Sequence, residues 1–484
     1  MKAWRSAGHE SQVGLNGDAT SMQRSIVRSM TLALASARYS VVCFLLNYHL
    51  PLKIIFAALR RLRPIAIMGT TVIVTKSRDV REVLRRFDDF ALGEILRPGI
   101  PWGPFLMTVD WREQHADERT LLQSVVCNGD VKTIRKVSAD KCREKLGLAA
   151  VDHAERGRID LVTELCEPVV VAITEAYFGI PAIKKNEPQM ARIMSNIASL
   201  IMVLPPEGSR RWAEQRDSMV KLTKHLKQLL QEKRQTAVAA PNPSRPTDIF
   251  SRLAQKLCSG SAEPKWFDDD WVRRHMTGLA GTGTATLVRA TVHAVDRLIA
   301  HPAALRRAQA VAATLDAHEE DERDLPSHAT GEERKEAWRR VEETRHRLRQ
   351  IVYEALRFRP MLPLLVRYSP RDSIIAKDTK RARTAPAGSR VIAAPLAAMF
   401  DPDAIEMPWR FCSSRPLEDL LHFGHGDRTC FGKYVADAAM LEVVRSLLRL
   451  PGLRRVSGPE GRVRYDGPVT SSLVLTFERC PPRT

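Results

Sequence analysis

The chain has 484 residues, of which 44% are hydrophobic and 27% are charged, so it can bury a large core and is not disordered or collagen-like. The 75 Lys and Arg exceed the 56 Asp and Glu by 19 charges, but basic residues are spread along the chain without an aromatic-interleaved RNA-binding motif, so no nucleic acid partner is expected. Eight cysteines without a CxxC pair indicate neither a structural zinc site nor a disulfide scaffold, and favour a reducing cytoplasm.

The N-terminal region divides into two parts. Residues 1–28 are polar and aperiodic, which predicts a flexible leader. Residues 29–59 are apolar, but Arg38, Pro51 and other polar residues interrupt them before the ~20 apolar residues that a spanning helix needs. We therefore expect no clear membrane span and interpret this segment as a surface-packing or interfacial amphipathic one. The protein is expected to be cytoplasmic, with peripheral membrane association as the alternative.

The next elements alternate between strand and helix signals. A β-rich run over residues 65–75 followed by a helical pattern over 78–87 predicts a strand or hairpin that leads into a helix. Residues 93–104 contain three prolines and three glycines and predict a loop. A helix follows from Asp110, which can cap it, with Glu113 three residues later as in a capping box.

The centre of the chain is predicted to be mostly helical, and strand signals return near its end. The helical periods cover residues 132–148, 159–178, 188–203, 209–233 and 268–300. Residues 316–333 are acidic and polar, which predicts a solvated loop beside a long helix that ends near Arg357. Strand-like pieces cover residues 364–368, 389–393 and 471–477.

One cysteine lies in a glycine-rich loop directly before a predicted helix. The loop runs from His422 to Gly432, contains three glycines around Cys430, and leads into an apolar helical segment. Glycines allow the backbone to approach a flat ligand, and a helix N-terminus lowers the pKa of a thiol. A thiolate in this place could bind iron. The alternative is a buried cysteine in a glycine turn.

This loop resembles the Phe-Gly-x-Gly-x-Arg-x-Cys-x-Gly signature of the cytochrome P450 family. The matching residues are Phe423, Gly424, Gly426, Arg428, Cys430 and Gly432. The resemblance implies that Cys430 is the axial ligand of haem b, with Phe423, Gly424 and Gly432 shaping the loop around it. It also implies a mainly α fold with a small β-rich lobe, formed as a single haem-thiolate catalytic domain by residues 60–484.

A pair on a predicted helix matches a structural motif of the same family. Glu354 and Arg357 are three residues apart on one helix face, and by themselves they are an ordinary surface ion pair. The resemblance implies that they are buried and locked to an arginine of the meander before the cysteine loop, which is Arg410 or Arg415.

Four residues are implied as contacts of the haem propionates. His115 and Arg119 are four apart and therefore lie on the same helix face, which could otherwise be a solvated one. Their positions resemble the family's propionate-binding helix. Arg367 on a predicted strand and Arg428 in the cysteine loop complete the group. A buried dianionic ligand requires charge-assisted donors of this kind.

The long helical segment 268–300 contains closely spaced glycines and threonines that weaken a helix. A cofactor or a tight helix crossing would explain them equally well. The family usually has Ala/Gly-Gly-x-Asp/Glu-Thr-Thr here. The chain keeps Ala280, Gly281 and Thr284, but Gly283 replaces the acid and Ala285 replaces the second threonine. The usual proton relay is therefore incomplete.

The resemblance implies a monooxygenase that inserts one oxygen atom from O2 into a small organic substrate. Because the chain has no reductase domain, electrons are expected from a separate ferredoxin-type partner. Gly283 motivates a second hypothesis, a haem-thiolate enzyme that uses or rearranges peroxide. A non-enzymatic haem sensor is the third, and the retained Thr284 and complete cysteine loop speak against it.

Overall fold

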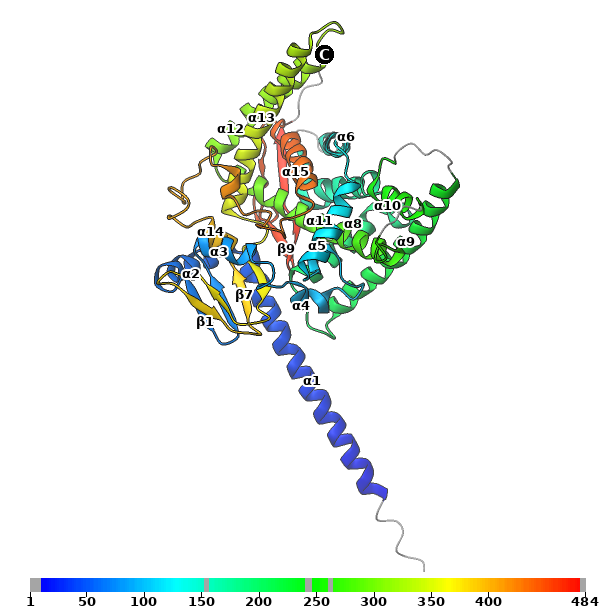
Figure 1. Cartoon of the computed structure of the whole chain (residues 1–484), viewed down its shortest axis with the longest axis vertical. Coiled ribbons are helices and arrows are strands. Elements are labelled where there is room, and N and C mark those ends of the chain that lie inside the picture. Colours follow the sequence, from blue (N-terminus) through cyan, green and yellow to red (C-terminus); the bar gives the residue numbers. More distant parts are fainter. Residues whose placement is uncertain (1–9, 152–155, 240–245, 260–263, 479–484) are drawn as a thin grey trace, which may run out of the picture.

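The computed structural model describes residues 10–151, 156–239, 246–259 and 264–478. A helical body adjoins a β-rich lobe, and one long helix leaves the body (Figure 1). The predicted mainly α fold with a small β-rich lobe is confirmed. The helices are α1 (Glu10–Asn47), α2 (His49–Leu62), α3 (Ser77–Arg85), α4 (Gly93–Leu96), α5 (Arg112–Ser124), α6 (Asp130–Val151), α7 (Glu167–Ala176), α8 (Glu187–Met202), α9 (Arg210–Ala239), α10 (Ile249–Cys258), α11 (Asp269–Ile299), α12 (Pro302–Arg323), α13 (Gly331–Phe358), α14 (Pro395–Ala398) and α15 (Lys433–Leu448).

The β-rich lobe is built on a four-stranded sheet in the order β1-β2-β7-β4. β2 pairs in parallel with β7, whereas β1 and β4 are antiparallel to their neighbours, so the lobe joins the N-terminal hairpin to strands more than 300 positions later. Smaller sheets pair β3-β11-β8, β10-β9 and β5-β6. The strands are β1 (Ile65–Met68), β2 (Thr71–Val74), β3 (Arg156–Asp160), β4 (Leu365–Tyr368), β5 (Ser373–Ile375), β6 (Arg383–Ala385), β7 (Arg390–Ala393), β8 (Arg454–Arg455), β9 (Arg464–Asp466), β10 (Val469–Ser472) and β11 (Val474–Glu478).

Helix α11 is the central element of the body. It has 31 residues, and the Asp268 side chain caps it by accepting a hydrogen bond from the Trp271 N–H. It packs against α7, α8, α13 and α15, and most of its side chains are buried. The candidate site depends on what the glycines of this helix face.

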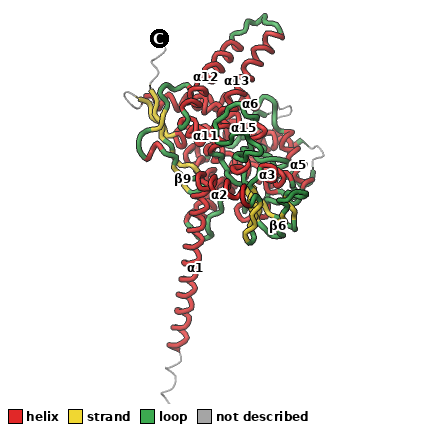
Figure 2. The backbone as a smooth tube through the Cα atoms, turned by 90° about the vertical axis from the view of Figure 1, so that its left-hand side faces the viewer, coloured by secondary structure: helices red, strands yellow, loops and turns green. Residues whose placement is uncertain are grey.

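Helix α1 extends away from the body in both views (Figures 1 and 2). It is continuous across residue 28, where the sequence analysis placed the end of the leader. Its part Ser29–Asn47 has 19 residues, is only 11% buried, and is long and apolar enough to cross a membrane. The expectation that polar residues and Pro51 interrupt the apolar segment was wrong. Pro51 lies beyond the end of α1, in α2, and Arg38 is the only charged residue within Ser29–Asn47.

The acidic segment 316–333, predicted to be a solvated loop, is mostly helical. α12 and α13 form a projecting antiparallel hairpin (Figure 2), and only residues 324–330 connect them. The prediction was wrong because two of the acids have buried partners. Asp316 and Glu319 both accept hydrogen bonds from Arg445 of α15. The predicted loop 93–104 likewise contains the short helix α4.

Candidate functional site

The cysteine loop crosses in front of the first turn of α15. Gly424 and Gly426 both have φ of 77°, a conformation that L side chains rarely adopt. A Cβ at Gly426 would lie 2.8 Å from the Arg85 Cα. The Cys430 N–H donates to the Phe423 carbonyl oxygen at 3.0 Å and closes the loop. The glycines therefore allow the close turn that places Cys430 just before the helix.

The Cys430 side chain is accessible to solvent, yet the surrounding protein affects its pKa. It is the exposed cysteine among those in the described residues, yet burial raises the pKa of its thiol. Both observations agree if the thiol faces a hollow inside the body rather than bulk solvent. The Gly432 N–H and the positive charges of Arg119 and Lys433 act in the opposite direction and favour the thiolate.

Arg367 brings a poorly compensated charge into the same region. Its guanidinium is buried on β4, where burial and the nearby Arg428 charge lower its pKa to about 10. Its one hydrogen bond is donated by Nη1 to the Val366 carbonyl oxygen at 3.0 Å, and it has no ion pair within the part of the chain that the structure describes. A buried cation without a carboxylate is costly unless an anion accompanies it.

Arg428 and His115 extend this positive cluster. Arg428 lies 3.9 Å above the Phe87 ring and pairs through Nη2 with Asp110 at 2.7 Å, but its Nε is buried and has no hydrogen-bond partner among the described residues. His115 is buried, and burial followed by the charges of Arg428 and Arg119 lowers its pKa to about 4. The Arg428 charge thus adds to burial in disfavouring the charged form of Arg367, and Asp110 is the carboxylate paired with Arg428. The region is electrostatically suited to an anion with two charges.

Asp110 has a different role from the one predicted. It does not cap α5, because Trp111 is the N-cap residue and no side chain closes that helix end. Instead, its two carboxylate oxygens accept hydrogen bonds from the Leu92 and Gly93 N–H groups at 2.9 Å, and one also accepts from Arg428. Asp110 therefore connects the loop before α4 to the cysteine loop.

The glycines of α11 have two different functions. A Cβ at Gly278 would lie 2.3 Å from the Phe105 ring, and one at Gly281 would lie 2.4 Å from Ile197 Cγ2 of α8. Both glycines allow close packing, and at Gly281 the neighbour is a helix, as the alternative of a tight helix crossing predicted. An added Cβ at Gly283 meets nothing within 4 Å, and Gly283 is exposed although most of α11 is buried. Gly283 therefore opens onto free space.

Thr284 and Ala280 lie beside this opening but are buried. The Thr284 hydroxyl donates to the Ala280 carbonyl oxygen at 2.9 Å and lies 3.3 Å from the Met194 Sδ. Ala280 and Gly281 pack into the body. Of the four residues predicted on the oxygen side, only Gly283 is open.

Glu354 and Arg357 form a fully buried bidentate pair, with distances of 2.7 and 2.8 Å. Arg415 is the third member, since its Nε lies 3.4 Å from Glu354 Oε1. Arg410 contributes only its backbone carbonyl, which accepts a hydrogen bond from Arg357. Its side chain is exposed. This pairing selects between the two arginines that the sequence left open.

A buried histidine–carboxylate pair near the site was not predicted from the sequence. His275 of α11 lies 3.0 Å from the Glu118 carboxylate of α5, and its ring stacks on Trp271 at 3.7 Å. The His275 ring lowers the pKa of Glu118 against the opposing effect of burial. No local pattern joins these residues, which lie on different helices. Ile100, Trp102 and Phe105, which follow α4 in the chain, are buried in the core.

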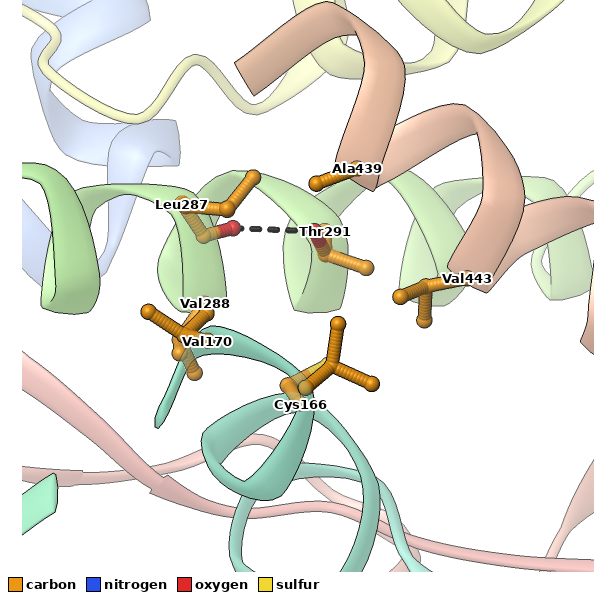
Figure 3. Close-up of a pocket in the computed structure, with 8 residues that line it drawn as sticks. Cys166, Val170, Leu287, Val288, Thr291, Ala439 and Val443 are labelled. Atoms are coloured by element: carbon orange, nitrogen blue, oxygen red, sulfur yellow. Dashed lines mark hydrogen bonds between the residues drawn. The ribbon is translucent and has the colours of Figure 1, made fainter. Parts of the chain in front are cut away.

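The apolar contact of α7, α11 and α15 lies further along α11 and is not a site. Figure 3 shows Cys166 and Val170 facing Leu287, Val288 and Thr291, with Ala439 above and Val443 at the right. The gap between these side chains is too narrow to admit a water molecule. Within it, the Thr291 hydroxyl donates to its own helix, to the Leu287 carbonyl oxygen.

Solved structures resemble this fold over most of its length. A cytochrome P450 called Eryk from S. erythraea has a TM-score of 0.67 and 22% sequence identity, and the match covers 90% of this chain and 97% of that one. A cytochrome P450 from Bacillus megaterium in complex with testosterone has a TM-score of 0.65 and 20% identity, with coverage of 88% and 99%. At this level of identity the likeness establishes the fold.

Curated relatives match short segments. A linoleate diol synthase of Gaeumannomyces graminis is 39% identical over 77 residues, which is 16% of this chain and 7% of the relative. The cytochrome P450 monooxygenase drtD of Aspergillus calidoustus is 31% identical over 105 residues, or 21% and 19% of the two chains. The chain thus spans less than a fifth of the length of these relatives. The family model described as cytochrome P450 matches residues 66–450. With its cysteine loop, its cation cluster and this match, the chain belongs to the cytochrome P450 family of haem-thiolate oxidoreductases.

Proposed function

We propose that the chain is a monooxygenase that inserts one oxygen atom from O2 into a small organic substrate, with haem b as cofactor. The observation that carries this proposal is Cys430, which is accessible although burial raises the pKa of its thiol, with the poorly compensated cation Arg367 in the same region. When bound, a thiolate-ligated haem iron supplies the O–O cleavage chemistry of such reactions. Electrons come from a separate ferredoxin-type protein.

In this proposal the cysteine loop holds the metal side of the cofactor. Cys430 is the ligand, and the Gly432 N–H stabilises its thiolate form. Gly424 permits the turn, and Phe423 packs beside the loop and receives the Cys430 N–H on its carbonyl oxygen. These residues fix the sulfur in place before the cofactor binds.

His115, Arg119, Arg367 and Arg428 are assigned to the propionates. Burial lowers the pKa values of His115, Arg367 and Arg428, and the charge of Arg428 lowers those of His115 and Arg367 further, so two carboxylates beside these residues would stabilise their charged forms. The unpartnered Arg428 Nε and the incompletely bonded Arg367 guanidinium provide donors for this purpose. Charge-assisted hydrogen bonds to such donors are the strong ones.

Gly283, Thr284, Ala280 and Gly281 are assigned to the oxygen side. The Thr284 hydroxyl donates its hydrogen bond to the Ala280 carbonyl oxygen. Because Gly283 carries no acid, proton delivery depends on water in the space that Gly283 leaves, or on groups of the substrate. Gly281 lets α8 approach closely, and the buried Ala280 packs beside it in the body.

A second candidate is the rearrangement of a hydroperoxide. It is favoured by Gly283, and by relatives named linoleate diol synthase and dioxygenase-epoxy alcohol synthase. A diol or an epoxy alcohol holds both oxygen atoms of an isomeric unsaturated hydroperoxide, so its formation needs neither O2 nor an electron donor. The absence of an acid at position 283 would not hinder such a reaction.

Turnover experiments separate the two candidates. The full chain is loaded with haem and given candidate apolar substrates with ferredoxin, reductase and NAD(P)H, or unsaturated fatty-acid hydroperoxides alone. Reductase-dependent product supports the monooxygenase. Product from hydroperoxide alone, with none from the electron-transfer system, contradicts it.

Gly283→Asp restores the acid of the family pattern, and Gly283→Asn is its matched uncharged control. The monooxygenase proposal predicts that only the Asp variant increases the fraction of consumed NAD(P)H that appears as product. Equal effects of both substitutions would contradict the proton-delivery role.

For localisation we propose membrane association through the apolar helix α1, whose 19-residue apolar part is mostly accessible.

A further inference from the structure

Arg289 of α11 is a fully buried guanidinium that binds the end of another helix. Nη2 donates to the Leu46 carbonyl oxygen at 2.5 Å, and Nη1 donates to Asn47 Oδ1 at 2.8 Å. Nη1 and Nε also donate to the carbonyl oxygens of Pro468 and Met361, at 2.6 and 2.9 Å. Across the described ranges it has no ion pair with a carboxylate. Its charge is stabilised by backbone oxygens, including one at the negative end of the α1 dipole.

The other groups around Asn47 fix the same junction. The Asn47 Nδ2 donates to the Gly467 carbonyl oxygen at 2.9 Å, so both ends of this amide are bound to the body. Arg359 donates to the Asn47 carbonyl oxygen at 3.3 Å and pairs with Asp296 of α11 at 2.8 Å. Asn47 is 4% exposed. Two hydrogen bonds therefore attach the last turn of α1 to α11, one attaches it to the β9-β10 turn, and one attaches it to Arg359 at the end of α13.

The opposite face of α1 and its neighbours present apolar side chains to the outside. On α1 itself Met30 and Leu34 are 68% and 64% exposed. Helix α2 and the turn between β1 and β2 follow directly in the chain and lie on the side of the body from which α1 leaves (Figure 1). Their exposed apolar residues are Leu50, Ile54, Ile55, Leu62, Ile67 and Met68. Arg61 and Arg63 are exposed among them.

We propose that Arg289 clamps the carboxyl end of a bilayer-inserted α1 onto the catalytic domain, so that α1 is a rigid arm and the apolar surface of α2 and the β1-β2 turn rests on lipid. This inference rests on the membrane association proposed above and adds its geometry. The partner is a phospholipid bilayer. The catalytic domain therefore has one fixed orientation relative to the bilayer, because α1 cannot rotate about Asn47.

The dimensions and the charges favour a bilayer. The apolar part of α1 has 19 residues, which at ~1.5 Å per residue is close to the ~30 Å of a bilayer core. In its last turns the side chains of Cys43, Leu46 and Asn47 are buried against the body. A bilayer that covers the whole apolar part must therefore also reach the adjoining surface. The exposed Arg61 and Arg63 suit phosphate headgroups beside that surface.

The clamp also explains why α1 belongs to the folded protein. Removal of residues up to 47 would take two of the four oxygen atoms to which Arg289 donates and leave a buried cation incompletely bonded. That loss is unfavourable in a dry interior. A segment that is cut off after targeting would not be expected to complete the hydrogen bonding of the central helix.

The test uses the full chain reconstituted in phosphatidylcholine vesicles, with two separate readouts. Flotation with the vesicles after alkaline carbonate washing measures insertion. Depth is measured by quenching of a Met68→Trp reporter with acyl-brominated lipid, taken as the difference from the unsubstituted chain. Leu148→Trp, at an exposed position of α6, is the matched control reporter, because α6 lies on the side of the body away from α1 (Figure 1).

We expect flotation of the full chain, quenching of the Met68→Trp reporter, and none of the Leu148→Trp reporter. Arg289→Met should keep flotation but lose most of the Met68→Trp quenching. Asn47→Ala, which leaves α11 untouched, should give the same loss, whereas Asn47→Asp keeps an acceptor for Arg289 and should retain the quenching. Failure of the full chain to float would overturn the membrane association. Flotation with unchanged quenching in Asn47→Ala would overturn the clamp alone.

Discussion

Alanine substitutions at two glycines of α11 test whether only Gly283 opens onto free space. At Gly283 an added Cβ meets no atom within 4 Å. The substitution should therefore add the helix-propensity difference between Gly and Ala and raise the free energy of unfolding by ~1 kcal/mol. Gly281→Ala is the matched control, two residues away in the same helix.

The control should have the opposite sign. Its Cβ would lie 2.4 Å from Ile197 Cγ2 and 3.2 Å from Ile197 Cβ, whereas carbon atoms in contact prefer ~3.5–4.0 Å. Overpacking of this kind costs ~1–3 kcal/mol, which exceeds the gain in helix propensity. Urea unfolding of the cofactor-free chain, followed by far-UV circular dichroism, should place the two variants on opposite sides of the unsubstituted chain. A loss of stability in Gly283→Ala equal to that in Gly281→Ala would refute the assignment of Gly283 to an open space.

Three further substitutions test the surroundings of the site. Arg415→Ala should lower the free energy of unfolding, because Glu354 loses a charge partner, whereas Arg410→Ala should change it by less than ~0.5 kcal/mol; equal effects in urea titrations would contradict the pairing. Arg367→Met removes a buried cation and should leave the stability of the cofactor-free chain unchanged or higher, but accelerate haem loss to apomyoglobin; slow haem loss would argue against a propionate contact. Burial lowers the pKa of His422 to about 4, so the stability from its neutral form is complete above pH ~6.5 and is lost, by roughly 3 kcal/mol, as the pH falls toward 4. His422→Gln should flatten the loss of stability between these pH values, and an unchanged pH profile would count against this cause.

The sequence predicted those features that depend on local patterns. Asp268 caps α11 where the helical period begins, and the β-branched run within residues 65–75 forms the β1-β2 hairpin. The cysteine loop was recognisable because its glycines, arginine and cysteine are close together in the chain. The buried state of the Glu354–Arg357 pair followed from the family motif.

Features that depend on distant partners could not be predicted. Asp110 resembled a helix cap, but its partner Arg428 lies 318 positions later. The acids of segment 316–333 predicted a solvated loop, because the sequence does not show that the buried Arg445 pairs with Asp316. Gly281 and Gly283 are equivalent in sequence pattern, and only the position of Ile197 on α8 distinguishes them.

The central claim is that Cys430 ligates a haem iron as a thiolate. The most direct measurement is the difference spectrum of the reduced, carbon monoxide-bound protein after haem loading, for the unsubstituted chain and for Cys430→His. We predict the red-shifted Soret band of a thiolate-ligated haem in the unsubstituted chain, and its replacement by a band of the histidine-ligated type in the variant. A haem-loaded chain without the thiolate-type band, or a Cys430→His variant that retains it, would contradict the account.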